Sequence, residues 1–195
     1  MTPGGLLALD VATATGWAYG VPGARPQWGT FDASKRGAEN GEILARFEDW
    51  IEGRLDEWQP AWVAFESPYV PRVAPTKVRV KGAVVATLPA PGVPLNAKVA
   101  RRLYQLCGLV ELACRRHAIE VREETASSIT QAFTGFAGWR GRDNKKKATV
   151  RMCEHYGWQV NDDNQADALA LWVYMESVFY PGSQRSAGPL FAQAR

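Results

Sequence analysis

Two short apolar runs that each end in an acid constrain this chain more than any other feature. The runs are LLALD, which ends at Asp10, and AWVAFE, which ends at Glu66. Runs of this length are typical of strands that are buried on both faces of a sheet. A buried carboxylate must be paired or must bind a cation, and open α/β sheets place their ligands at strand ends. The two runs therefore predict one shared site at a single edge of a sheet.

The pattern around these runs predicts an α/β domain with a mixed sheet. Further strands are expected at 17–20, 27–31 and 119–122, and the first three strands form an antiparallel meander. Apolar stripes with a period of 3.6 residues predict helices at 39–58, 96–117, 143–156 and 164–179, and a short helix that Thr125 or Ser127 caps. Asn40 is the expected cap of the helix at 39–58. Asp143 is the expected cap of the helix at 143–156, which Gly157 is expected to end. The helix before the second acidic run indicates a crossover that makes its strand parallel to an earlier one.

Length and composition fit a single domain. The chain has 195 residues, of which 46% are hydrophobic and 22% charged, as in ordinary globular proteins. We expect one domain over 1–180 and a flexible tail over 181–195. No run is long enough to span a membrane and the first residues do not resemble a secretion signal, so a cytoplasmic location is expected. The three cysteines show no metal-binding spacing and are expected to be reduced thiols.

Basic residues gather in two tracts of this nearly neutral chain. Residues 67–104 hold seven basic residues and no acid, and residues 139–151 hold six basic residues beside Asp143. The first tract includes a proline-rich segment at about 67–95, read as a long loop with a β-ribbon at 78–88. Two such tracts indicate a polyanionic partner, although each tract alone also fits a solvated face.

A second pair of acids opens the last expected helix. Asp163 and Asp167 are four residues apart, so both fall on one helical face. With Asp10 and Glu66 they supply the oxygen ligands that hard divalent cations prefer. Two Mg²⁺ ions held in this way can cleave a phosphodiester, because one activates the attacking water and the other stabilises the leaving 3′ oxygen. Each acid by itself also fits a capping role.

Three segments resemble the RuvC-type Holliday junction resolvases, and more closely their short phage forms. They read LALDVATATGWA, VAFESP and NKKKATVRMCEHYG followed by DDNQADALAL, and the resemblance spans most of 6–178. It implies an RNase H-like fold with a mixed five-stranded sheet flanked by helices, in a bacterial or phage-infected cell. It implies an endonuclease that nicks four-way junctions with two Mg²⁺ ions per site, Mn²⁺ substituting, and the ligands Asp10, Glu66, Asp163 and Asp167. Glu66 lies at a strand end, as in the resolvases, whereas ribonuclease H takes its Glu from a helix.

The chain departs from this family at one ligand position. Bacterial members often carry two acids three residues apart on the last helix, whereas position 164 is Asn here. Asp163 is therefore the expected fourth ligand, and Asp162 and Asn164 are the alternatives. The family also keeps a basic residue near the site, a role that Lys146 or Lys147 could fill, and Lys147 is taken as the catalytic one.

Contacts with the nucleic acid and between subunits complete the prediction. The expected phosphate contacts come from Arg72, Lys77, Arg79, Lys81, Arg140, Arg142, Lys145 and Lys146. Tyr69 and Trp139 either stack on exposed bases or pack within the fold. Two symmetric nicks require a C2 homodimer, and the helix at 96–117 is the expected interface.

Two other functions remain open from the sequence. The chain could be another RNase H-like nuclease, such as a ribonuclease that acts on RNA–DNA hybrids, although the place of Glu66 argues against it. It could also be a non-catalytic nucleic-acid-binding protein with this fold, although the full set of acids argues against that.

Overall fold

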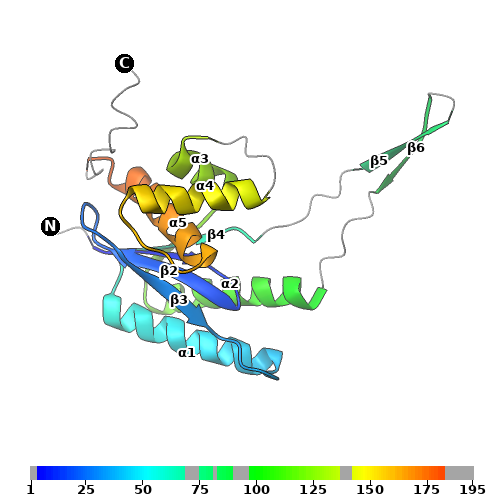
Figure 1. Cartoon of the computed structure of the whole chain (residues 1–195). Coiled ribbons are helices and arrows are strands. Elements are labelled where there is room, and N and C mark those ends of the chain that lie inside the picture. The colour runs from blue at the N-terminus through cyan, green and yellow to red at the C-terminus, as the bar shows by residue number, and fades with distance from the viewer. Residues whose placement is uncertain (1–3, 69–74, 81–82, 90–96, 137–141, 183–195) are drawn as a thin grey trace, which may run out of the picture.

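The computed structural model describes residues 4–68, 75–80, 83–89, 97–136 and 142–182, and gives the backbone alone for 75–80, 83–89 and Arg142. Five strands form one sheet in the order β3-β2-β1-β4-β7 (Figure 1). β1 is antiparallel to β2, and β2 to β3, whereas β4 is parallel to both β1 and β7. This arrangement confirms the predicted meander, crossover and mixed sheet. The strands are β1 (Leu6–Asp10), β2 (Ala14–Gly20), β3 (Gln27–Asp32), β4 (Trp62–Glu66) and β7 (Glu120–Glu124).

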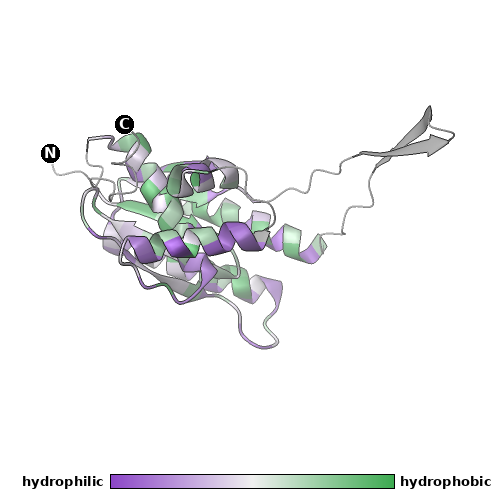
Figure 2. Ribbon diagram, turned by 45° about the horizontal axis from the view of Figure 1, so that its top comes forward, coloured by the Kyte–Doolittle hydropathy of each residue, from purple (hydrophilic) through white to green (hydrophobic). Residues whose placement is uncertain are grey.

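Five helices cover the two faces of this sheet (Figure 1). One face lies against α1 (Asn40–Trp58) and α2 (Ala97–Arg116), and the other lies against α3 (Ala126–Thr134), α4 (Arg142–His155) and α5 (Asp163–Phe179). Side chains alternate along a strand, so β1 contributes Leu7 and Leu9 to the first core and Leu6 and Ala8 to the second. Figure 2 shows the apolar ribbon gathered between the layers and the hydrophilic ribbon turned outward.

Two of the predicted helix caps are wrong. Glu39 caps α1, because its side chain and that of Glu42 form a reciprocal capping box. Asn40 is the first helical residue, and its side chain instead contacts Gln105 and Arg102 on α2 at 2.9 and 2.8 Å. Asp143 lies inside the first turn of α4 rather than before it. The other expectations hold, since Thr125 caps α3 and Gly157 follows α4 with a φ of +72°.

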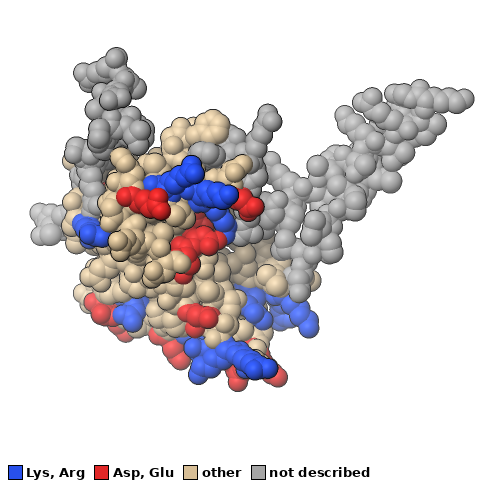
Figure 3. Space-filling view, viewed as in Figure 1, with Lys and Arg blue, Asp and Glu red and all other residues tan. Residues whose placement is uncertain are grey.

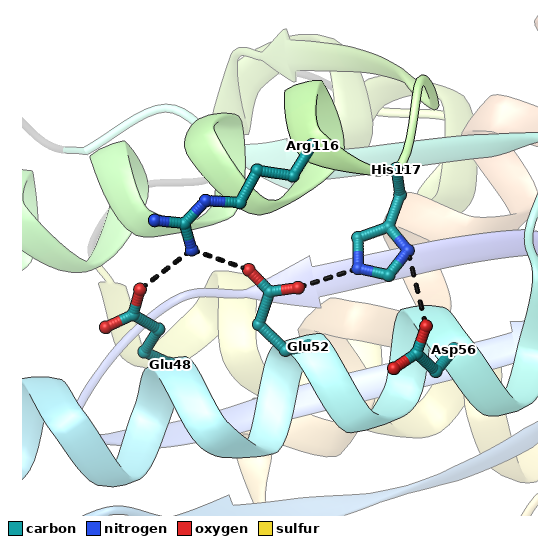
Figure 4. A network of polar contacts seen from close by, with 5 residues as sticks. All are labelled: Glu48, Glu52, Asp56, Arg116 and His117. Atoms are coloured by element: carbon teal, nitrogen blue, oxygen red, sulfur yellow. Dashed lines mark hydrogen bonds and ion pairs between the residues drawn. The ribbon is translucent and has the colours of Figure 1, made fainter.

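A polar network joins the last turn of α2 to the side of α1 (Figure 4). Arg116 lies between Glu48 and Glu52, with N···O distances of 2.9 and 2.8 Å. His117 lies 2.6 Å from the second oxygen of Glu52 and 3.6 Å from Asp56. The three acids recur every four residues along α1, so they form one row that the two basic side chains span. The network therefore fixes α2 against α1 outside the apolar core.

The predicted β-ribbon is present as a separate two-stranded sheet, which Figure 1 draws apart from the main sheet. Its strands are β5 (Pro75–Val80) and β6 (Ala83–Pro89), which pair antiparallel with an irregularity between Val78 and Arg79. An isolated hairpin of two strands is marginally stable in water.

Two further expectations concern the cysteines and the membrane. Cys107, Cys114 and Cys153 are buried and free, and burial raises the pKa of each thiol to about 12. They are inert thiols of the core, as predicted. Among the described helices, none is long and apolar enough to cross a membrane.

Candidate active site

The two strand-end acids lie side by side, as the sequence predicts. Leu9 pairs with Phe65 in the parallel ladder, so the next residues, Asp10 and Glu66, end neighbouring strands at the same level. Ala8 and Ala64, two residues earlier, both belong to the core beneath α5. Because side chains alternate along a strand, both acids face the same side of the sheet as α5.

The start of α5 rests directly on β2. Gly16 pairs with Asp10 in the sheet, and a Cβ on Gly16 would lie 1.9 Å from the carbonyl oxygen of Asn164. The Asn164 side chain donates to the carbonyl of Ala14 at 3.0 Å. Only a residue without a side chain at position 16 allows this approach. The contact places the first turns of α5 over the end of β1.

The capping residue of α5 is Asp162. Its carboxylate accepts hydrogen bonds from the backbone N–H of Gln165 at 2.8 Å and from the Thr30 hydroxyl at 2.6 Å. The cap ties α5 to β3 and fixes the rotation of the helix. Asp167, one turn further along, therefore lies close enough to Asp10 to act on its charge.

The electrostatics of Asp10 identify its neighbours. Burial, together with the carboxylates of Asp167 and Glu66, raises the pKa of Asp10 to about 8. Lys146 and Lys145 oppose this shift and lower the pKa of Asp10. A half-buried acid beside two other acids is a costly arrangement that a divalent cation would relieve. The structure thus brings together three of the four predicted ligands with two lysines of α4.

The fourth predicted ligand lies differently. Asp163 forms an ion pair with Lys146, and it is not among the main charges that act on Asp10. The two alternatives are also engaged, Asp162 as the helix cap and Asn164 with the backbone of β2. The structure therefore groups Asp163 with the lysine of α4 rather than with Asp10.

The oxygen donors suit Mg²⁺ or Mn²⁺ in kind, because carboxylates are the ligands that hard cations select. Within the ranges that the structure describes, no three His, Cys, Asp or Glu side chains already meet with the geometry of a metal site. The convergence of Asp10, Glu66 and Asp167 on a cation is therefore a proposal, supported by their shared edge and their mutual electrostatic effect.

The sequence pattern did not predict a third acid at a strand end, Glu124 of β7. Glu124 pairs with Glu66 in the ladder between β4 and β7, so it faces the same side of the sheet. It accepts a hydrogen bond from the Tyr174 hydroxyl of α5 at 3.2 Å and lies 3.7 Å from Arg122. The predicted strand stopped at Arg122, two residues too early, and a strand extended to its last acid would have found Glu124.

The predicted basic contacts are only partly described. Lys145 and Lys146 lie near Asp10, and Lys147 is exposed. Lys146 and Lys147 both line a surface pocket, together with Asp163. Figure 3 shows basic side chains gathered over α4 with acidic ones beside them. Lys77 and Arg79 lie on β5 and Arg142 opens α4. Arg72, Lys81, Arg140, Tyr69 and Trp139 lie outside the described residues.

This sheet order, with a meander followed by two parallel strands and helices on both faces, defines the chain as a protein of RNase H-like fold. Solved structures share this fold. RuvC of T. thermophilus, in complex with a Holliday junction substrate, superposes with a TM-score of 0.62 at 16% identity and covers 91% of this chain and 94% of that one. A second Thermus thermophilus RuvC structure gives 0.59 at 14% identity, over 89% and 95%. The yeast mitochondrial Holliday junction resolvase Ydc2 gives 0.55 at 9% identity, over 90% and 78%.

Comparisons at the level of sequence found no match. No protein-family model matches the chain. No curated protein matches it either. The structural likeness shows the RuvC fold, and the predicted fold is therefore confirmed.

Proposed function

We propose that this protein is a structure-selective DNA endonuclease that nicks four-way junctions by metal-assisted hydrolysis. The observation that carries the proposal is the placement of Asp10 and Glu66 on adjacent strand ends beneath Asp167 of α5. The fold that holds them superposes on a RuvC structure in complex with a Holliday junction substrate. The same edge carries lysines of α4, which suit a phosphate backbone.

The proposed chemistry needs no covalent intermediate. Asp10, Glu66 and Asp167 would hold two Mg²⁺ or Mn²⁺ ions, which supply an activated water and stabilise the departing oxygen. The water oxygen bonds to phosphorus, the bond from phosphorus to the 3′ oxygen breaks, and the products carry a 5′ phosphate and a 3′ hydroxyl. Lys146 and Lys145, whose charges act on Asp10, would bind the non-bridging phosphate oxygens as negative charge develops there.

The basic ribbon and the expected dimer belong to the same proposal. A two-stranded β-ribbon fits the major groove of DNA, and Lys77 and Arg79 on β5 supply charges for phosphates. Part of the apolar side of α2 serves the chain's own core, because Leu106, Val110 and Ala113 are buried. A C2 dimer through α2 would instead use its exposed apolar residues Val99, Tyr104 and Leu112.

The deciding experiment is incubation of a labelled four-way junction with Mg²⁺ and the wild type, Asp10→Asn or Asp167→Asn. Asp49→Asn is the matched control, because Asp49 is an exposed acid on α1, across the sheet from α5. We expect symmetric nicks by the wild type and the control, and a loss of about 10²-fold or more in both site variants. No cleavage by the wild type, or full cleavage by both site variants, would refute the proposal. An RNA–DNA hybrid and a linear duplex in parallel reactions separate junction cleavage from hybrid cleavage.

A further inference from the structure

The ion pair between Lys146 and Asp163 connects two helices at the candidate site. Lys146 lies in the second turn of α4, and Asp163 is the first residue of α5. The Nζ atom of Lys146 contacts Oδ2 of Asp163, with 27% of the lysine side chain and 46% of the aspartate side chain exposed. The pair therefore spans the gap between α4 and α5 close to the end of β1.

Lys146 interacts with an acid on α5 and with an acid on β1. Its charge also reaches Asp10, whose carboxyl belongs to the strand-end cluster. A lysine side chain has a flexible four-carbon stem, so it holds one position only where a partner fixes it. Asp163 is the acid that forms an ion pair with this ammonium group.

The neighbours of Asp163 do not point toward a metal. Asp162 is committed to the helix cap, and Asn164 is committed to the Ala14 carbonyl. These two contacts set the rotation of the first turn of α5, and in that rotation the Asp163 carboxylate meets α4. Asp167 lies one turn later and acts on Asp10 directly.

We propose that Asp163 is a positioning residue that holds Lys146 beside the carboxylate cluster, and that it does not ligate the metal ions. The inference rests on the proposed nuclease function for its kinetic consequence, but the assignment of the ligands can be tested by metal binding alone. Loss of Asp163 should leave the cation site intact and release Lys146. Loss of Asp167 should weaken the cation site itself.

The first test measures Mn²⁺ binding to the full chain, by electron paramagnetic resonance of the free ion, for the wild type, Asp163→Asn and Asp167→Asn. We expect Asp163→Asn to bind Mn²⁺ within about twofold of the wild type and Asp167→Asn to lose tenfold or more. A loss in Asp163→Asn equal to that in Asp167→Asn would overturn the proposal and make Asp163 a ligand. Thermal melts of each variant show that the fold is retained, and Asp163→Ala replaces Asp163→Asn if the latter melts early.

The second test is a double-mutant cycle on junction cleavage with Asp163→Asn, Lys146→Met and both together. We expect Asp163→Asn to lower the cleavage rate by roughly two- to fivefold, as for a partly exposed pair, and Asp163→Glu to restore it. The double variant should be no slower than Lys146→Met, because Asp163 acts only through Lys146. Additive losses, or an unchanged rate in Asp163→Asn, would refute the positioning role. A wild type that cuts no junction would refute the nuclease function, while the Mn²⁺ titration would still decide whether Asp163 is a ligand.

Discussion

The carbonyl oxygen of Asn164 lies where a side chain on Gly16 would have to be, only 1.9 Å from an ideal Cβ. Gly16 is also the sheet partner of Asp10, so this single close approach sets the height of α5 above the acid. A backbone atom cannot rotate away as a flexible side chain can. The contact is therefore a rigid spacer between α5 and β2, the neighbour of β1.

Substitution of Gly16 by Ala should consequently push α5 away from the sheet. We expect a destabilisation of roughly 1–3 kcal/mol, as for overpacking of a rigid interior, and a larger loss of metal affinity because Asp167 moves with the helix. Urea unfolding and Mn²⁺ titration measure the two effects. Gly53→Ala is the control, since Gly53 lies in α1 with open space around it and should gain stability. Equal behaviour of the two variants would contradict the spacer role.

Asp10 predicts a stability that depends on pH and on metal. Its folded-state pKa of about 8 lies above the ordinary value of 3.8, so the folded protein binds an additional proton between these values. Metal-free wild type should therefore lose stability as pH rises from about 4 to about 8. Asp10→Asn removes this dependence and should be more stable at pH 8 by on the order of 1–3 kcal/mol.

Urea unfolding with a chelator at pH 5, 6, 7 and 8 tests this expectation. The free energy of unfolding of the variant should exceed that of the wild type by a margin that widens with pH. Asp49→Asn, which changes an exposed acid on α1, should follow the wild type throughout. A constant difference between Asp10→Asn and the wild type over this range would show that Asp10 is not buried among like charges.

Divalent cations should stabilise the folded protein through the same carboxylates. A ligand that binds only the folded state at 100 times its Kd adds about 2.7 kcal/mol, which corresponds to several degrees in Tm. We expect Mg²⁺ or Mn²⁺ to raise the Tm of the wild type and to have little effect on Asp167→Asn. Calorimetric scans with and without metal measure the difference, and an equal shift in both proteins would place the cation elsewhere.

The two neighbouring lysines of α4 should differ in their effect on catalysis. Lys146 reaches Asp10, whereas Lys147, the residue chosen from the sequence, is exposed on α4. Lys146→Met should therefore slow junction cleavage by about 10²-fold, as for loss of a group that stabilises developing charge. Lys147→Met should cost much less, and should act mainly on DNA affinity and its salt dependence. Single-turnover rates beside binding curves separate the two roles, and a reversed order would return the catalytic role to Lys147.

The polar network between α1 and α2 should lose its contribution to stability at low pH. The hydrogen bond from Arg116 lowers the pKa of Glu52 below its ordinary value of 4.5, burial opposes this effect, and the hydrogen bond from His117 adds to it. The stabilisation is present above pH 4.5 and is lost as pH falls through the folded-state pKa. Arg116→Ala should lower the Tm by only about 1–3 °C at pH 7, because the pair is exposed. The difference should vanish near pH 3, and a difference that persists there would mean that Arg116 acts through packing.

The sequence alone determined the sheet and the edge on which the acids lie. Apolar runs that stop at Asp10 and Glu66 are local signals, and the crossover helix between them makes their strands parallel, so their meeting follows from chain geometry. The helix that begins near Asp163 is equally local, because a capping acid and a run of small apolar residues define it. These features needed no knowledge of any distant contact.

Only the tertiary structure decided which way each acid and lysine points. Four-residue spacing places Asp163 and Asp167 on one helical face, but the rotation of α5 comes from the Asp162 contact with Thr30 and the Asn164 contact with Ala14. Those partners lie more than 100 residues away, and no local pattern encodes them. Local sequence also cannot distinguish Lys146 from Lys147, because the two neighbours have identical chemistry. The packing of α4 against α5 places Lys146 near Asp10. Periodicity predicts which side chains share a helical face, whereas the packing of the helices decides which neighbour each of those side chains meets.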